Sequence, residues 1–189
     1  MEKHTPCAPL HLITGGSGSG KSAYAESCVL KTALSASNHE IRQIYIATMI
    51  PYGEEGRQRV ERHRRLRAEK NFETVECYTG LERLRIDDYD SSCSIVLLEC
   101  MSNLVANEMF EQDGAGNDTV RAILRGVDAL RQQAGHLFIV TNEVFSDGIT
   151  YDAETMRYMS YLGEVNRALA EEADTVTEVV YGIPLSVRI

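Results

Sequence analysis

The sequence predicts an α/β fold in which a mainly parallel central sheet is flanked by helices. Three observations predict this class. Short apolar runs alternate with helical patterns, a glycine-rich segment directly follows the first run, and the length of 189 residues suits one compact domain. We therefore expect a single domain over residues 10–189, preceded by a loose tail at residues 1–9.

Five apolar runs are expected to form buried strands. Parallel strands that are covered on both faces read as nearly continuous apolar sequence, and each of these runs ends before polar or glycine-rich residues. The expected strands are Leu10–Thr14, Ile44–Thr48, Ile95–Leu98, Leu137–Thr141 and Thr175–Tyr181.

Helical patterns fill the intervals between these runs. Asp118 is expected to cap one helix, because apolar residues recur at helical spacing after it. Asp113–Asn117 reads as a loop and Asp147–Gly148 as a turn. The expected helices are Ala23–Ser35, Glu54–Lys70, Met101–Glu111, Asp118–Gln133 and Asp152–Glu172.

The charge balance is acidic, with a formal net charge of -9, which argues against binding to nucleic acid or to a membrane surface. Seven of the 19 Lys and Arg nevertheless fall between Arg57 and Lys70, which indicates a local anion site. No apolar run approaches the ~20 residues of a membrane span, and the polar N-terminus does not resemble a signal peptide. The five cysteines match no zinc signature and are expected to be reduced thiols of a cytoplasmic protein.

The strongest motif is a phosphate-binding loop that matches G-x-x-x-x-G-K-[ST]. Glycines allow backbone N–H groups to approach phosphate oxygens, and the N-terminus of the next helix adds partial positive charge. Lys21 is expected to reach the β- and γ-phosphates as a catalytic residue, and the Ser22 hydroxyl to bind Mg²⁺. A plain glycine-rich turn is the alternative, which the register of the lysine and serine disfavours. The loop consists of Gly15, Gly16, Ser17, Gly18, Ser19, Gly20, Lys21 and Ser22.

A carboxylate ends the apolar run Ser94–Leu98. Glu99 should emerge at the carboxyl end of the sheet, where ligands bind in open α/β folds. There it is expected to hold Mg²⁺ with Ser22, directly or through water. The alternative is a carboxylate that stabilises the start of the following helix.

A single histidine lies among the arginines of Arg57–Arg67. On a helix, Arg59, His63 and Arg67 share a face. Neighbouring positive charge disfavours imidazolium and would bind a polyphosphate, so His63 is a candidate nucleophile toward an α-phosphate. By composition alone, a solvated basic face with an incidental histidine is the commoner arrangement.

These motifs, in this order, resemble a known family from about residue 10 to residue 189. The family is the bifunctional adenosylcobinamide kinase/adenosylcobinamide-phosphate guanylyltransferases of cobalamin biosynthesis. The matching segments are Ile13–Ser22, Tyr45–Thr48, Arg59–His63, Thr74–Glu76, Leu97–Cys100, Thr141–Val144, Gly163–Asn166 and Gly182–Leu185.

The resemblance implies a P-loop, RecA-like enzyme that assembles as a homotrimer. Such an enzyme phosphorylates adenosylcobinamide with a nucleoside triphosphate, ATP or GTP. It then guanylylates its own histidine with GTP and passes GMP to adenosylcobinamide phosphate. By resemblance His63 is that histidine. The positions implied around the nucleotide, besides the phosphate-binding loop, are Thr48, Met49, Ile50, Leu66, Arg67, Ala68, Glu69, Glu76 and Glu99.

Three segments depart from the family pattern. Many members carry Arg where this chain has Gly18, and many have two adjacent histidines where this chain has Arg62 before His63. After Val144 the family usually continues G-x-G-I-V-P, whereas this chain reads Phe145–Tyr151, in a region that the resemblance associates with the corrinoid site.

Two other functions are alternatives to this one. A P-loop kinase for another small molecule would need the phosphate-binding loop and Glu99 but not His63. A GTP-dependent regulatory switch usually carries N-K-x-D, and Thr141–Val144 lacks its lysine and aspartate. The D-x-x-G match at Asp113–Gly116 has no strand before it, so the sequence disfavours the switch.

Overall fold

The computed structural model describes residues 7–35, 41–68, 70–86 and 93–188. Within the helix 53–67 it describes the backbone, but not the side chains, of residues 59, 63 and 66. The tail predicted at residues 1–9 falls mostly outside these ranges. No helix in the described part of the chain is both long enough and apolar enough to cross a membrane.

A seven-stranded sheet forms the centre of the described structure, in the order β3-β2-β4-β5-β1-β6-β7. All neighbouring strands are parallel except β6 and β7, which are antiparallel. The predicted fold class, with its mainly parallel sheet, is confirmed, but two edge strands were not predicted. The strands are β1 (Leu10–Thr14), β2 (Arg42–Ala47), β3 (Phe72–Glu76), β4 (Ser94–Glu99), β5 (His136–Val140), β6 (Thr175–Val180) and β7 (Ile183–Arg188).

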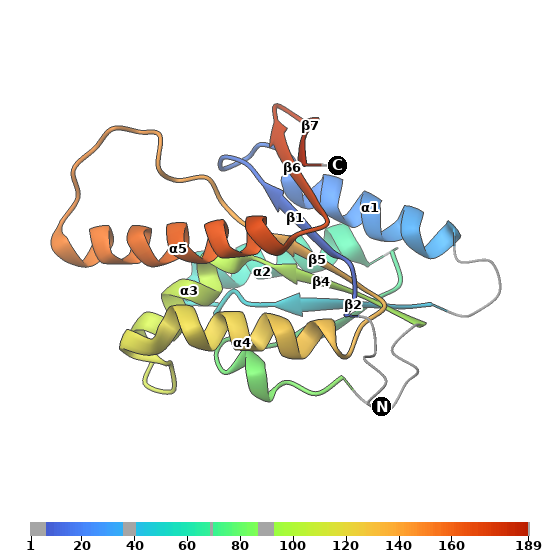
Figure 1. Ribbon diagram of the computed structural model, residues 1–189, viewed down its shortest axis with the longest axis horizontal. Helices are drawn as coiled ribbons and strands as arrows, with labels where there is room; N and C mark the ends of the chain where they lie inside the picture. The colour runs from blue at the N-terminus through green and yellow to red at the C-terminus, as the bar shows by residue number, and fades with distance from the viewer. Residues whose placement is uncertain (1–6, 36–40, 69, 87–92, 189) are drawn as a thin grey trace.

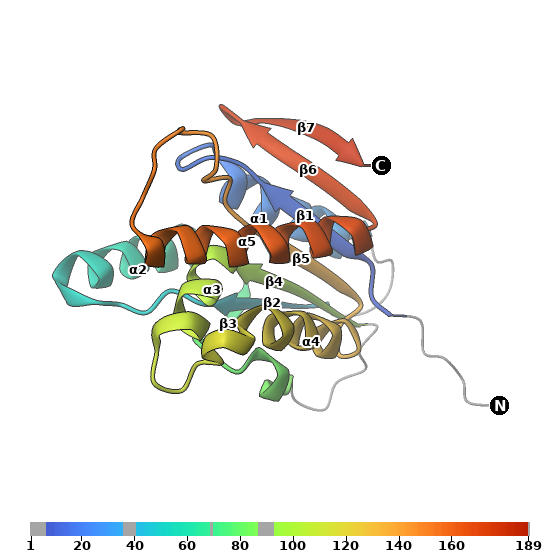
Figure 2. The same ribbon diagram turned by 60° about the vertical axis from the view of Figure 1, so that its left-hand side comes forward.

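Within the described ranges five α-helices surround the sheet, and their bounds lie within three residues of those predicted. Helices α3, α4 and α5 cover one face and α1 covers the other, while α2 projects from the body (Figure 1, Figure 2). The helices are α1 (Lys21–Ser35), α2 (Gly53–Arg67), α3 (Met101–Phe110), α4 (Thr119–Arg131) and α5 (Ala153–Glu172), with short 3-10 helices η1 (Leu81–Arg83) and η3 (Gly116–Asp118).

The predicted capping role of Asp118 is wrong. Asp118 does occupy the position before α4, but among the described atoms its side chain makes no capping hydrogen bond. It accepts hydrogen bonds from Arg121 and Arg125 instead. Charged partners within two turns of the helix have displaced the backbone N–H groups as donors. Asp152, in contrast, accepts from the backbone N–H groups of Glu154 and Thr155, each at 3.0 Å, and thereby caps α5.

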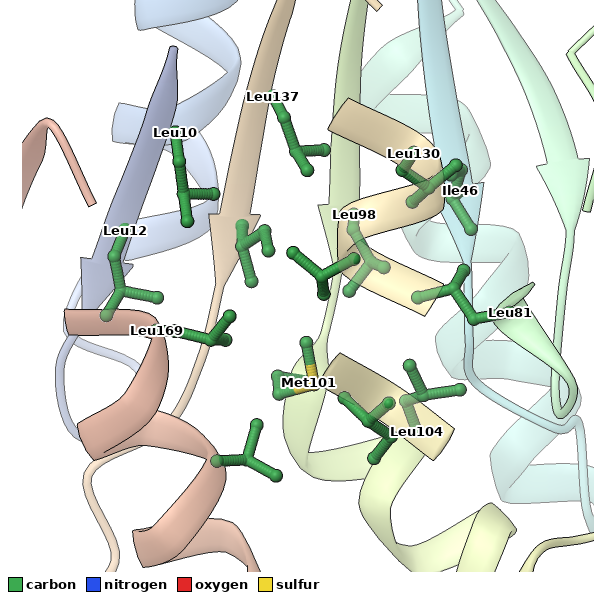
Figure 3. Packing of buried hydrophobic residues seen from close by; sticks show 14 of the residues in the cluster. Leu10, Leu12, Ile46, Leu81, Leu98, Met101, Leu104, Leu130, Leu137 and Leu169 are labelled. Atoms are coloured by element: carbon green, nitrogen blue, oxygen red, sulfur yellow. The ribbon is translucent and has the colours of Figure 1, made fainter. Parts of the chain in front are cut away.

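The main hydrophobic core lies between the sheet and the layer of α3, α4 and α5. Figure 3 shows side chains from β1, β2, β4 and β5 meeting those of the three helices. Burial of this many aliphatic groups is the dominant favourable term in folding. The labelled residues are Leu10, Leu12, Ile46, Leu81, Leu98, Met101, Leu104, Leu130, Leu137 and Leu169.

The register of the parallel strands aligns their carboxyl ends. Ala47 of β2 lies opposite Glu76 of β3 and Glu99 of β4, and Glu99 lies opposite Val140 of β5. Val140 in turn pairs with Ile13, the last residue but one of β1. The phosphate-binding loop and two carboxylates are therefore brought to the same edge of the sheet.

Candidate functional site

The phosphate-binding loop joins β1 to α1, and Lys21 is the first residue of that helix. Its ammonium donates to the carbonyl oxygen of Gly16 at 3.0 Å, which holds the side chain across the loop. Burial lowers the pKa of Lys21, while Cys100 and Glu99 act in the opposite direction. Gly15 has φ +152°, and a Cβ there would lie 2.5 Å from the carbonyl oxygen of Val179, so the loop requires glycine at this position.

The two predicted magnesium ligands lie together. The Ser22 hydroxyl donates a hydrogen bond to Oε1 of Glu99, whose residue is 8% exposed. Oε2 of Glu99 is buried and has no hydrogen-bond partner among the described residues. A hydroxyl oxygen beside an unsatisfied carboxylate oxygen suits Mg²⁺, which binds one or two protein oxygens together with phosphate and water. The donor set therefore fits this ion.

A cavity of about 460 Å³ opens beside these groups at the carboxyl edge of the sheet. Its size is that of a small-molecule site. Eight residues predicted to bind nucleotide or metal line it: Ser17, Gly18, Lys21, Ser22, Met49, Arg67, Glu76 and Glu99. The other lining residues are Tyr45, Ala47, Val60, Arg62, Cys100, Asn103, Val140 and Asn142.

Helix α2 contributes a buried arginine to this cavity. Arg67 is 6% exposed, and its guanidinium carbon lies 3.5 Å from the centre of the Tyr45 ring. Its Nε and Nη1 have no hydrogen-bond partner within the described ranges. Burial, together with Glu99, raises the pKa of Tyr45, so the phenol is neutral beside the guanidinium. Such an arginine presents an unsatisfied positive edge to an anionic ligand.

Glu76 ties α2 to the sheet. It ends β3, accepts a hydrogen bond from Arg64 at 2.7 Å and accepts another from the Tyr78 hydroxyl at 2.9 Å. Arg62, two residues before Arg64, lines the cavity. This ion pair thus connects α2, whose Arg62 lines the cavity, to the end of β3.

Thr48 stabilises the backbone beside the cavity through hydrogen bonds to Cys100 and Asn107. Its side chain is fully buried, and its hydroxyl both donates to the Cys100 carbonyl oxygen and accepts from the Cys100 N–H, each at 2.8 Å. Its carbonyl oxygen accepts from Nδ2 of Asn107 at 2.8 Å. Thr48 therefore fixes the junction between β4 and α3, at which Glu99 is placed.

The remaining predicted residues occupy varied positions. Gly16, Ser19 and Gly20 form the turn of the phosphate-binding loop, in which Ser19 N–H donates to Gly16 at 3.2 Å. Ile50 is half-buried and Ala68 is the exposed cap residue of α2. Glu69 and the side chains of His63 and Leu66 lie outside the described residues. The backbone of His63 belongs to α2, directly after Arg62.

Several residues that line the cavity were not predicted from the sequence. Tyr45 lies within an apolar run, where alternation puts it and Ala47 on the face opposite Ile44 and Ile46. Asn142 follows the carboxyl end of β5, a position that often carries binding groups in open α/β sheets. Asn142 could therefore have been predicted from its place after the strand, whereas the sequence around Tyr45 indicates only that the residue is buried.

Comparison with known proteins gives a consistent family assignment. A family model described as cobinamide kinase / cobinamide phosphate guanyltransferase matches residues 11–187. Among solved structures, a KaiC-like protein from Pyrococcus horikoshii has a TM-score of 0.49 and 12% identity, over 92% of this chain and 71% of that one. That structural likeness is too weak to bear on function.

Curated relatives match almost from end to end. The "Bifunctional adenosylcobalamin biosynthesis protein CobU" of Escherichia coli K12 is 32% identical, over 94% of this chain and 98% of the relative. The protein of the same name from Salmonella typhimurium LT2 is 30% identical over the same shares. The "Bifunctional adenosylcobalamin biosynthesis protein CobP" of Pseudomonas aeruginosa PAO1 is 30% identical, over 94% of this chain and 96% of the relative. The chain therefore belongs to the bifunctional cobinamide kinase / cobinamide phosphate guanyltransferase family of adenosylcobalamin biosynthesis.

Proposed function

We propose that this chain phosphorylates adenosylcobinamide with ATP or GTP and then transfers GMP from GTP to adenosylcobinamide phosphate, giving adenosylcobinamide-GDP. The observation that carries the proposal is one cavity lined by Lys21 and Ser22 of the phosphate-binding loop, by Glu99, and by Arg62 and Arg67 of the basic helix. These groups provide the positive charge that both phosphoryl and nucleotidyl transfer require.

In the kinase reaction, the loop N–H groups and Lys21 hold the β- and γ-phosphates. Mg²⁺ would be held by Ser22 and Glu99 and would supply further positive charge against the phosphate oxygens. The hydroxyl oxygen of the substrate forms a bond to the γ-phosphorus as the bond to the β,γ-bridging oxygen breaks. The hydroxyl proton is released to solvent and the nucleoside diphosphate departs.

In the guanylyltransferase reaction, a ring nitrogen of His63 attacks the α-phosphorus of GTP, and pyrophosphate leaves. A phosphate oxygen of adenosylcobinamide phosphate then attacks the same phosphorus, and the phosphorus–nitrogen bond breaks. Covalent capture divides one difficult displacement into two easier ones. The proposal is supported by the place of His63 on α2, between two arginines that line the cavity, Arg62 and Arg67.

We also propose that the protein is a homotrimer, acts in the cytoplasm and has no nucleic-acid partner. The acidic net charge of -9 supports the proposal that it does not bind nucleic acid. The edge strand β7 supports self-association, because Tyr181, Ile183, Leu185 and Val187 leave an apolar row exposed along it and its preceding turn. A native mass near three times 21.1 kDa is expected, and a monomeric mass would contradict the trimer.

The regulatory-switch alternative finds no support in the cavity. The loop that contains Asp113 and Gly116 is held on the far side of α3, where the Glu108 carboxylate accepts the N–H of Ala115 at 2.9 Å. The same carboxylate accepts the N–H of Gly80 at 2.7 Å. These contacts give the D-x-x-G segment a packing role.

The test is incubation of the purified protein with Mg²⁺ and GTP labelled at the α-phosphate, followed by a denaturing gel. We expect a protein-bound label that acid removes and alkali does not, which identifies a histidine phosphoramidate. His63→Ala should abolish the label, whereas the control His39→Ala should retain it. A folded, GTP-binding wild type that stays unlabelled would refute the covalent step and leave a P-loop kinase as the better account.

A further inference from the structure

Helix α1 carries a buried carboxylate that the nucleotide site does not use. Glu26 lies five residues after Lys21, and its side chain is 7% exposed. Burial of a carboxylate is costly unless it has a partner of opposite charge. In the described structure this partner is Lys70, whose ammonium donates a hydrogen bond to Oε2 of Glu26. Lys70 lies 44 residues further along the chain, in the turn after α2, so the pair joins the helix of the phosphate-binding loop to the end of the basic helix.

The backbone connects Lys70 directly to Arg67. The N–H of Lys70 donates to the carbonyl oxygen of Arg67 at 2.9 Å. Arg67 is the last residue of α2, and it lines the nucleotide cavity. Glu26 therefore holds Lys70 through its side chain, while Arg67 is bound to the same residue through the main chain. A displacement of Lys70 would move the end of α2 from which Arg67 enters the cavity.

The guanidinium of Arg67 depends on its backbone for its direction. It lies 3.5 Å from the centre of the Tyr45 ring, and attraction to a ring face, unlike a hydrogen bond, does not select one N–H direction. Its Nε and Nη1 have no hydrogen-bond partner among the residues that the structure describes. Tyr45 packs in one core cluster with Ala25 and Val29 of α1. Helix α1 thus supports both the ring that contacts Arg67 and the carboxylate that holds Lys70.

Two ion pairs fasten this end of α2, and they differ in burial. Helix α2 projects from the body of the molecule, so its direction depends on the contacts near its ends (Figure 1, Figure 2). The pair of Arg64 with Glu76 is open to solvent, with side chains 54% and 45% exposed. The pair of Lys70 with Glu26 is much less open, at 32% and 7%. Exposed ion pairs contribute little, whereas removal of one partner from a buried pair leaves an uncompensated charge. Lys70 and Glu26 therefore form the firmer of the two connections.

We propose that Lys70 and Glu26 are a positioning pair, which sets α2 relative to α1 and thereby directs the guanidinium of Arg67 at the phosphates of the nucleotide. The inference rests on the proposed function, of which it needs only the binding of a nucleoside triphosphate in the cavity. Neither member of the pair contacts the nucleotide, and their effect passes through Arg67. A pair that only stabilised the fold would change the Tm without changing the contribution of Arg67 to binding.

The test is a double-mutant cycle in which calorimetric titration measures the Kd for a non-hydrolysable GTP analogue. Lys70→Met should raise this Kd about fivefold or more, because Arg67 is no longer directed at phosphate. Lys70→Met combined with Arg67→Met should bind within about twofold of Arg67→Met alone, since residues that act through one another are not additive. Lys70→Arg should restore the wild-type Kd within about twofold, because a guanidinium can also pair with Glu26. The control is Lys31→Met, at an exposed position of α1, which should leave the Kd unchanged.

A second variant separates positioning from folding, because Lys70→Met alone leaves the buried carboxylate without its cation. Glu26→Gln/Lys70→Met removes both charges, so it should melt closer to wild type than Lys70→Met does and bind the analogue as weakly.

An unchanged Kd in Glu26→Gln/Lys70→Met, with folding intact, would overturn the positioning role. So would losses in Lys70→Met and Arg67→Met that multiply in the combined variant, since the two residues would then act independently. A wild type that does not bind the analogue would overturn the proposed function and this inference together. Binding of the analogue does not depend on labelling, so a wild type that binds it but is not labelled by GTP refutes the histidine step and leaves this test intact.

Discussion

Two buried charged groups face the nucleotide cavity with part of their polar surface unsatisfied. Within the described structure, Nε and Nη1 of Arg67 and Oε2 of Glu99 have no hydrogen-bond partner. A buried charge without partners costs several kcal/mol in general, so a native chain keeps one only where a ligand completes it. The positive charge of Arg67 and the negative charge of Glu99 together suit a polyphosphate with its metal ion. The phosphate would face Arg67 and the cation would face Glu99.

Arg67→Met should weaken nucleotide binding without weakening the fold. The variant keeps an unbranched side chain over Tyr45 but removes the unpaired guanidinium, so the Tm of the nucleotide-free protein should stay equal or rise by a few degrees. The Kd for a non-hydrolysable GTP analogue should rise about tenfold or more, because the charge-assisted contacts to phosphate are lost. Calorimetric titration and thermal denaturation measure the two effects.

The control for Arg67→Met is Arg65→Met on the same helix. Arg65 is exposed and lies 3.7 Å from Glu61 in an i,i+4 pair, so its loss should change both the Kd and the Tm little. A lower Tm for Arg67→Met together with an unchanged Kd would assign Arg67 a structural role. It would also remove the anion site from the description of the cavity.

At the scale of elements, the central strands were predictable and the edge strands were not. β4 is buried at all six positions and reads as a continuous apolar run. β3 reads FETVE, in which only Phe72 and Val75 are apolar, and three of its five positions are exposed. β7 carries Pro184 and is exposed along its whole length, so its sequence lacks the signal of burial that identified the others.

The parts of the candidate site that were predicted from the sequence are those whose position the strands determine. The phosphate-binding loop directly follows β1 and Glu99 ends β4, so the register of the sheet determines where both lie. Arg67 was predicted both from its helical spacing to His63 and by resemblance, while its burial against Tyr45 depends on how α2 docks, which no local pattern encodes. The same holds for Asn142, whose role depends on the contact with Ser102 of a different element.

A close approach between α4 and η1 gives a prediction about element packing. Gly126 lies in the middle of α4, where alanine is normally favoured by about 1 kcal/mol. Here a Cβ would stand 2.7 Å from Cβ of Leu81 and 3.0 Å from the backbone nitrogen of Glu82. Gly126→Ala should therefore destabilise the protein by about 1–3 kcal/mol, measured by urea denaturation.

Gly163→Ala in α5 is the matched control for this prediction. The nearest atoms to a Cβ at Gly163 are those of the Phe145 ring, at 3.5 and 3.6 Å, which is an ordinary contact. This substitution should stabilise the chain by about 0.5–1 kcal/mol. If both variants raise the unfolding midpoint, helix propensity rather than packing decides the outcome at Gly126.

At the scale of the whole molecule, the two ends of the sheet differ in their chemistry. The carboxyl ends of the strands carry the proposed site, whereas the amino ends of β1 and β5 carry a pair of half-buried histidines. Nε2 of His11 lies 3.3 Å from Nδ1 of His136, and Nδ1 of His11 lies 2.9 Å from the Thr175 hydroxyl. His11 also stacks on Phe138, with ring centres 4.4 Å apart. This packing favours neutral imidazoles in the folded chain.

The histidine pair should make the stability of the molecule depend on pH in a defined window. Burial lowers the pKa of both His11 and His136, and the His136 ring lowers the pKa of His11 further, while Asp174 acts in the opposite direction on both. The unfolded chain takes up these protons as the pH falls through about 6.5, and the folded chain does so only at lower pH. The free energy of unfolding should therefore be constant from about pH 8 to 7 and should decrease from about pH 6.5 to 5.

Urea denaturation at several pH values between 5 and 8 measures this dependence, above the range in which most carboxylates titrate. The double variant His11→Gln/His136→Gln should be flatter over the same window, whereas His39→Gln should follow the wild type. If the double variant retains the full slope, the pair does not control the pH response and other groups must bind the protons. If the slope is lost, acid sensitivity arises at the end of the sheet opposite the cavity, and changes in activity above pH 7 must then come from the site itself.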